Sequence, residues 1–182
     1  MNNRIKEMVY AGLLTALAII IPSYFGFLRI FVPPAFSATI AAHVPMMMAM
    51  LISPFVAAVV GVGSTLGFLM SGLPAPVVAR AATHIVVGYI GAKIVMKYSN
   101  YAMAAAITAP IHGFLEMIIV IPFIGITVDW ALVVTLVGSI VHHGVDAVIA
   151  YVIVKAVAKA RKKNIYSALG NFNGQVSSMS WQ

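Results

Sequence analysis

The sequence contains no cysteine and few charged residues: Asp, Glu, Lys and Arg together make up 8% of its 182 residues. Without cysteine, disulfide frameworks, thiolate metal sites and cysteine nucleophiles are excluded. Soluble domains usually have roughly 25% charged and roughly 45–50% apolar residues. Here 62% of the residues are hydrophobic, more than a body of this length could bury. Most side chains must therefore face lipid or other membrane helices, and a large catalytic domain outside the membrane is excluded.

Acidic residues are especially rare, with four Asp and Glu against 11 Lys and Arg, which gives a formal net charge of +7. In a soluble protein this balance would suggest a nucleic-acid partner. Here the basic residues stand at the ends of apolar blocks, where they are typical of membrane topology. We therefore expect a lipid bilayer around the chain and no nucleic-acid partner.

Pro, Gly and charged residues divide the chain into six apolar blocks, at about residues 5–23, 37–52, 54–71, 76–97, 101–123 and 130–158. They predict an all-α integral membrane protein with six transmembrane helices. The first block has no convincing cleavage site and is expected to be retained. The aromatic-rich segment 24–36, interrupted by Pro33-Pro34, is expected to be an interfacial loop or cap. Ser53-Pro54 predicts a tight hairpin, because proline suits the start of a helix.

The basic residues give a topology. In a six-span chain, nine of the 11 fall on one side, and the positive-inside rule makes that side cytoplasmic, with both termini. We expect a multi-pass protein of the plasma membrane, with a membrane domain at 1–163. The tail 164–182 is expected to be disordered or in part derived from an expression vector. The nine are Arg4, Lys6, Lys93, Lys97, Lys155, Lys159, Arg161, Lys162 and Lys163.

Polar residues inside the spans are the most informative feature, because ionisable groups in lipid are costly unless they are paired or face a cavity. Three pairs have the i,i+4 spacing that places both side chains on one helical face. With His43 they fall at overlapping depths, which predicts one polar cavity near the outer side. The alternative is that they form helix–helix hydrogen bonds that fix packing. The pairs are Arg80/His84, His112/Glu116 and His142/Asp146.

The charges of this cluster constrain its ligand. The only outer residues of fixed positive charge are Arg29 and Arg80, so a small heteroaromatic molecule that forms hydrogen bonds is expected rather than an inorganic anion. Trp130 and other aromatic residues near the outer surface could stack on a ring. Aromatic residues at that depth are also common as interfacial belts.

Metal transport is the competing chemistry, because five histidines and nearby carboxylates are suitable ligands. No His-Glu-x-x-His signature exists, so no metal site or cofactor is predicted, and a metal-ion permease stays the alternative. Ser64, in the segment GVGSTLG, is better explained by close helix packing than as a nucleophile. The glycines around it do not form a phosphate-binding loop. We therefore do not expect an enzyme.

Small residues cover one face of the first predicted helix at the spacing that lets another helix approach closely. They can serve packing within the bundle or the docking of a partner membrane protein. These residues are Ala11, Gly12, Thr15, Ala16 and Ala18.

Several segments resemble the substrate-binding S components of energy-coupling factor (ECF) vitamin transporters. They are AGLLTALA on the first helix, AAHVPMMMAMLISPFVAAVVGVGSTLGF, LPAPVVARAATHIVVGYIGA, IHGFLE and VHHGVDAVIA. The resemblance covers about residues 4–160. It is closest to the subgroup for hydroxymethylpyrimidine, pyridoxine, niacin or cobalamin.

This resemblance implies a high-affinity binding subunit of an ATP-driven importer. Its substrate would be a water-soluble vitamin or precursor, with hydroxymethylpyrimidine or pyridoxine favoured and niacin or cobalamin as alternatives. The loops 24–36, 71–76 and 124–130 would cover the pocket. The first helix would contact a membrane T component that works with two cytoplasmic ATPases. Residues expected to line or close the pocket are Arg80, His84, His112, Glu116, His142, Asp146, His43 and Trp130.

Overall fold

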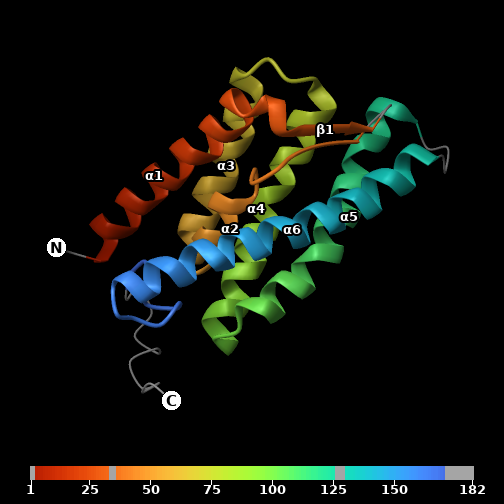
Figure 1. The fold of residues 1–182 in the computed structure, drawn as a ribbon. Coiled ribbons are helices and arrows are strands. Elements are labelled where there is room, and N and C mark those ends of the chain that lie inside the picture. Colours follow the sequence, from red (N-terminus) through yellow and green to blue (C-terminus); the bar gives the residue numbers. More distant parts are fainter. Residues whose placement is uncertain (1–2, 33–35, 126–129, 171–182) are drawn as a thin grey trace.

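The computed structural model describes residues 3–32, 36–125 and 130–170. Within them the chain forms a bundle of helices with a two-stranded hairpin at one end (Figure 1). The helices are α1 (Asn3–Tyr24), the 3-10 turn η1 (Gly26–Leu28), α2 (Val44–Met50), α3 (Pro54–Met70), α4 (Ala75–Tyr98), α5 (Tyr101–Ile124) and α6 (Trp130–Ala160). The antiparallel strands are β1 (Arg29–Val32) and β2 (Phe36–Thr39).

Four helices, α1, α4, α5 and α6, are long and apolar enough to cross a membrane, and α3 is a shorter apolar helix of 17 residues. For these five the predicted bounds agree with the structure to within two residues. Local signals explain the agreement. The side chain of Ser53 accepts a hydrogen bond from the amide of Val56 and caps α3 next to Pro54, while Asn100 caps α5 in the same way. Both are favoured N-cap residues.

The prediction of a second spanning helix at 37–52 is wrong. The segment forms strand β2, a turn, and the seven-residue helix α2, which at 1.5 Å per residue is far too short to cross a bilayer alone. The described part of segment 24–36 is not a plain loop either, since it contains η1 and β1. Pairing of Arg29 with Thr39 and of Val32 with Phe36 supplies the backbone hydrogen bonds that a helix would otherwise make. The predicted number of six transmembrane helices is therefore not confirmed.

Helix α2 is the centre of the bundle despite its length. It contacts α1, α3, α4 and α6, and Met46, Met47 and Met50 are almost completely buried. Flexible methionine side chains suit an irregular space between several helices. The turn that precedes α2 is thereby held deep between the long helices.

Close crossings among α1, α3 and α4 depend on glycine. A Cβ built on Gly61 of α3 would lie 2.7 Å from the Cα of Ile85 in α4, and one on Gly63 would collide with the side chain of Thr15 in α1. These glycines therefore serve packing, as the sequence indicated for the segment around Ser64.

Gly61→Ala should destabilise the protein, because the backbone of α4 would have to move away. We expect a loss of about 1–2 kcal/mol, the cost of overpacking less the gain in helix propensity. A lower thermal unfolding temperature of purified protein would show it. Gly12→Ala is the matched control, since nothing lies within 4 Å of a Cβ at that position. Equal unfolding temperatures in the two variants would contradict the expectation.

The start of α1, the α4–α5 connection and the end of α6 lie at the same end of the bundle (Figure 1). That this end is cytoplasmic stays a prediction, as does the domain boundary at 163. The first tail residues, 164–170, pack onto the bundle: Ala168 and Leu169 are buried, and Arg161 donates a hydrogen bond to the carbonyl of Ala168 at 2.6 Å. Residues 171–182 lie outside the described residues.

Candidate functional site

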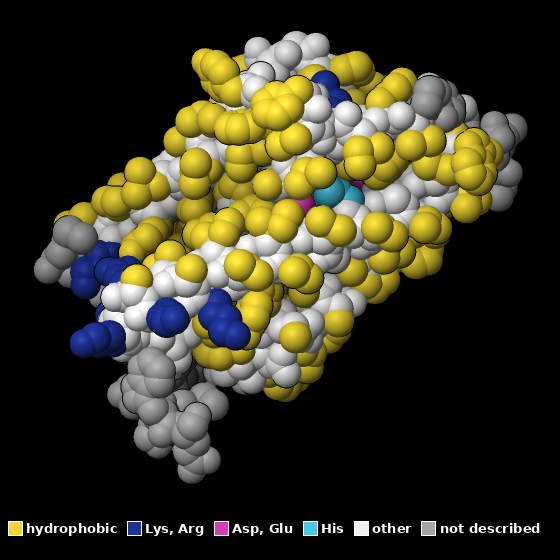
Figure 2. Space-filling model, viewed as in Figure 1, with side chains coloured by type: hydrophobic (Ala, Val, Ile, Leu, Met, Phe, Trp, Pro, Cys, Tyr) yellow, Lys and Arg dark blue, Asp and Glu magenta, His cyan; other side chains and the backbone are white. Residues whose placement is uncertain are grey.

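All five histidines of the chain gather where α4, α5 and α6 meet the turn before α2, and His43 of that turn is at the centre. Its ring centroid lies 4.5 Å from that of His84, 4.7 Å from His112, 4.3 Å from His142 and 6.3 Å from His143. A small histidine surface is visible in a hollow beside α6 (Figure 2). The predicted convergence of polar residues from separate segments is present in the structure.

Asp146 of α6 fixes the position of the central turn. Its Oδ1 accepts a hydrogen bond from the amide of Ala41 at 2.8 Å, and its Oδ2 accepts one from the amide of His43 at 2.9 Å. The same Oδ2 lies 3.2 Å from Nδ1 of His43 and 3.1 Å from Nε2 of His142. The predicted His142/Asp146 pair therefore exists, and its carboxylate also binds a turn more than 100 residues away in sequence.

Glu116 of α5 is the second carboxylate of the site. Its Oε2 accepts hydrogen bonds from Nη2 of Arg80, at 2.8 Å, and from the hydroxyl of Ser139. Its Oε1 lies 3.3 Å from Nε2 of His112, the partner predicted by spacing. All of these side chains are buried, so the Arg80–Glu116 pair joins α4 and α5 in a region that water hardly reaches.

Arg80 lies on one helical face with His84, as predicted, but their observed partners lie on other elements. Arg80 binds Glu116, and its guanidinium carbon lies 5.1 Å from the ring centroid of Phe36, in cation–π geometry. Nδ1 of His84 is 3.2 Å from the hydroxyl of Ser64. The i,i+4 spacing placed both side chains on one helical face, although it could not assign their partners on other helices.

Sequence reasoning missed four residues of the site: Phe36, Thr39, Ser139 and Thr108. His142 Nε2 lies 3.0 Å from the carbonyl oxygen of Thr39, and the hydroxyl of Thr108 lies 3.0 Å from Nε2 of His143. Ser64 was considered in the sequence only as a nucleophile, and His143, in the segment VHHGVDAVIA, was not chosen as a site residue. Small hydroxyl residues carry no signal of their own, since they also occur at helix crossings without a polar partner.

A small cavity opens inside the cluster. Its volume is about 20 Å³, enough for about one water molecule. The walls come from α4 and α5, from β2 and the turn before α2, and from Phe68 of α3 and His142 of α6. Nε2 of His84, a buried side chain that lines the cavity, makes no hydrogen bond within the described part of the chain. The polar lining residues are Ser37, Thr39, His43, Arg80, His84, Glu116 and His142.

Two aromatic or basic residues from the prediction lie elsewhere. Trp130 is 66% exposed at the first residue of α6 and does not line the cavity. Arg29 belongs to β1, where its side chain donates to the hydroxyl of Thr39 and to the carbonyl of Pro22, both at 3.3 Å. It thus ties the hairpin to the end of α1. Most of the predicted covering loop 124–130 lies outside the described residues.

The histidines and carboxylates of the cluster also have the composition of a metal site. One ligand atom from each of His43, His84, His112 and Glu116 lies within 4.8 Å of the others, and His43, His142 and Asp146 form a second such group. Imidazole and carboxylate suit Zn²⁺ or a similar divalent ion. Arg80 opposes this use, because its charge already neutralises Glu116.

The small-residue face of α1 divides in the structure. Ala11 and Ala18 are buried, and Thr15 packs towards Gly63 of α3. Gly12 and Ala16 face outward. Packing within the bundle therefore accounts for Ala11, Thr15 and Ala18. Of the five predicted docking residues, Gly12 and Ala16 are the ones accessible to a partner.

Comparisons with known proteins identify the family of the chain. No protein-family model matches the chain, and no solved structure does so significantly. A curated relative, the niacin transporter NiaX of Lactococcus lactis subsp. cremoris (strain MG1363), is 31% identical over 185 residues, covering 92% of this chain and 82% of the relative. The chain belongs to the S components of ECF vitamin transporters.

Membership in this family accounts for the main properties of the chain. This S component is a multi-pass membrane protein for vitamin uptake. The family implies a vitamin substrate and partners of the T-component and ATPase kinds. It is a family of transport subunits and not of enzymes, and the buried cluster around His43 is the candidate site for the vitamin.

Proposed function

We propose that this S component binds nicotinate, the anionic form of niacin, in the cavity between β2, α4 and α5. The observation that carries the proposal is the buried guanidinium of Arg80, which lines the cavity between Phe36 and Glu116. The name of the relative, a niacin transporter, also favours niacin over the hydroxymethylpyrimidine or pyridoxine that the sequence favoured.

In the proposed complex the carboxylate of nicotinate pairs with Arg80. Arginine has five N–H donors, so it can hold Glu116 and a second carboxylate together. Nε2 of His84 then donates to the ligand or accepts from it, which gives this buried nitrogen a partner. Phe68 lines the cavity and provides apolar surface for the ring, while Phe36 packs beside the guanidinium of Arg80.

Entry of this ligand requires the cavity to enlarge. Its volume of about 20 Å³ is several times too small for a pyridine carboxylate. The long helices form one wall, whereas the other wall is the hairpin and the turn around Ala41, which are tied to α6 through side-chain hydrogen bonds of Asp146 and His142. We therefore assign the hairpin and turn as the element that moves when substrate enters.

Delivery across the membrane is assigned to the complete transporter. The chain has no phosphate-binding loop, so ATP hydrolysis belongs to the two ATPases, and a T component would contact α1. Of the five predicted docking residues, Gly12 and Ala16 are the exposed ones, and we propose that the contact is made there. The close approach that small residues permit is the physical reason.

Calorimetric titration of the purified chain tests the substrate. Nicotinate should bind at least tenfold more tightly than nicotinamide, because the neutral amide cannot form the charge-assisted pair with Arg80. His84→Ala should weaken nicotinate binding about tenfold or more, since a buried hydrogen bond to a charged ligand is lost. Tyr89→Phe, at an exposed position of the same helix, is the matched control.

The same titration separates the alternatives. Tighter binding of hydroxymethylpyrimidine, pyridoxine or cobalamin would replace nicotinate within the same family. Stoichiometric binding of Zn²⁺ to metal-free protein that is lost in His84→Ala would favour the alternative hypothesis, that the cluster binds a metal ion. Equal affinities of the His84 and Tyr89 variants for nicotinate would overturn the placement of the site.

A further inference from the structure

A long apolar groove runs between α5 and α6, apart from the histidine cluster. Its volume is about 370 Å³, and its surface is almost entirely apolar. Small residues from both helices make up most of its lining, so few side chains fill the space between the two backbones. These residues are Ala102, Ala105, Ala106 and Ala109 of α5 with Gly144 and Ala147 of α6.

At Tyr151 this groove meets a second one, of about 640 Å³, which is bordered by four lysines. The ammonium group of Lys155 lies 5.7 Å from the ring centroid of Tyr151, the residue shared by both grooves. Among the described residues no carboxylate lines either groove, so the lining itself supplies no counter-charge for the four lysines. The lysines are Lys155, Lys159, Lys162 and Lys163.

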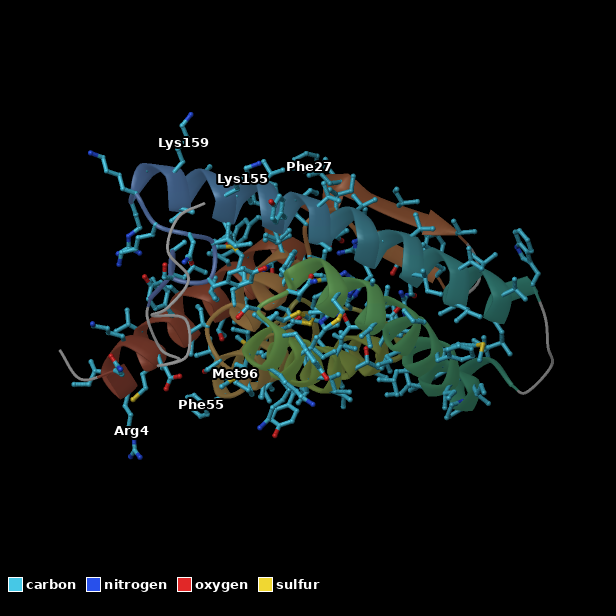
Figure 3. All side chains as sticks on the ribbon, turned by 90° about the horizontal axis from the view of Figure 1, so that it is seen from below. Arg4, Phe27, Phe55, Met96, Lys155 and Lys159 are labelled. Carbon is cyan, nitrogen blue, oxygen red and sulfur yellow. The ribbon has the colours of Figure 1, made fainter. Side chains whose placement is uncertain are left out.

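The figures show this positive charge on the surface of α6 that faces away from the bundle. Lysine and arginine surface is concentrated over the end of α6 and the start of α1, and apolar surface continues from it along α6 (Figure 2). Lys155 and Lys159 extend from α6 on the side of the bundle opposite to Arg4 (Figure 3). The lysines therefore form a positive rim at one end of an apolar channel.

The dimensions fit one leaflet of a bilayer. From Gly144 to Lys155 the helix advances 11 residues, or about 17 Å at 1.5 Å per residue. Half of the hydrocarbon core is about 15 Å thick. If the lysines lie at the membrane surface, Gly144 therefore lies close to the midplane, and the apolar groove spans the depth occupied by one acyl chain.

We propose that the two grooves together bind one anionic phospholipid of the leaflet at the lysine end. One acyl chain lies along the alanines and Gly144, and the headgroup phosphate is held by the lysines. Basic pockets next to membrane helices on the cytoplasmic side bind anionic headgroups by this chemistry. The continuity of an apolar channel with a lysine-lined groove favours a lipid, because a single phospholipid supplies both an acyl chain for the channel and a phosphate for the lysines.

Native mass spectrometry of the full chain, delipidated in detergent, tests this site. The probes are palmitoyl-oleoyl phosphatidylglycerol and phosphatidylcholine with the same acyl chains. A one-to-one phosphatidylglycerol adduct is expected, at least tenfold more abundant than the phosphatidylcholine adduct. Lys155→Gln with Lys159→Gln should reduce it roughly tenfold or more, because each lysine near an anionic surface contributes roughly a factor of five.

Two further variants make the result specific. Gly144→Leu should also reduce the adduct by filling the groove, and it should fold normally, since nothing lies within 4 Å of a Cβ there. Lys93→Gln with Lys97→Gln, which neutralises two lysines of α4 at the same end of the bundle, should leave the adduct unchanged. Equal adducts with both lipids, an adduct insensitive to Gly144→Leu, or an equal loss in the α4 variant would overturn the proposal.

Discussion

Arg80→Gln is expected to abolish nicotinate binding and to lower the stability of the protein at the same time. The guanidinium is the buried positive charge of the cavity, and the variant leaves the buried carboxylate of Glu116 without its ion-pair partner. Removing one member of a buried pair usually costs about 3–5 kcal/mol. Calorimetric titration with nicotinate and thermal unfolding of the same sample measure the two effects.

A double variant separates binding from folding. Arg80→Met with Glu116→Gln removes both charges, keeps similar volumes, and leaves an amide that can still pair with Ser139. Replacing a buried ion pair by neutral groups is often close to neutral for stability, so this protein should unfold near the wild-type temperature and still fail to bind nicotinate. Lys93→Gln, an exposed position of α4 outside the cavity lining, is the control. Wild-type affinity in the double variant would refute the role of Arg80.

Asp146→Ala is expected to release the turn that carries His43. The carboxylate accepts the amides of Ala41 and His43 and lies within 3.2 Å of two imidazoles. Alanine would leave two backbone donors without an acceptor, and each unsatisfied buried group costs about 1–3 kcal/mol. We expect a loss of stability on the order of 3 kcal/mol. Amide hydrogen exchange should become much faster at Ala41–His43, with little change in the middle of α4.

Ala41→Gly provides the companion variant for this turn. Ala41 has a φ of 70°, a left-handed conformation that costs a non-glycine residue about 1–2 kcal/mol. Glycine removes that strain while Asp146 remains, so stability should rise slightly and exchange should stay slow. If both variants accelerated exchange equally, the turn would be held by something other than the carboxylate.

Both predictions concern residues that form or hold the walls of the same cavity. The long helices present Arg80, His84 and Glu116 from fixed backbones, whereas His43 and β2 reach the cavity on a short irregular segment. Asp146 connects that segment to α6 through hydrogen bonds to its backbone. In the proposed function, breaking and remaking this connection accompanies entry of the substrate, so Asp146 is a positioning residue that acts through His43.

The sequence alone determined much about this protein. Scarcity of charge established the membrane class, and the bounds of five helices followed from apolar length, Pro54 and the caps Ser53 and Asn100. The same scarcity singled out the residues of the site, because few ionisable groups are tolerated in lipid without a function. The i,i+4 pairs His112/Glu116 and His142/Asp146 were predictable, since helical spacing is a local property.

Only the tertiary structure decided how these residues are connected. The segment 37–52 is apolar enough for a helix, but pairing with β1 and the hydrogen bonds of Asp146 make it a strand, a turn and a short helix. The partners of Arg80 and His84 lie on other helices, and three residues of the predicted docking face of α1, Ala11, Thr15 and Ala18, are packed within the bundle. Contacts between residues far apart in sequence leave no periodic signal, and their geometry depends on how the helices cross.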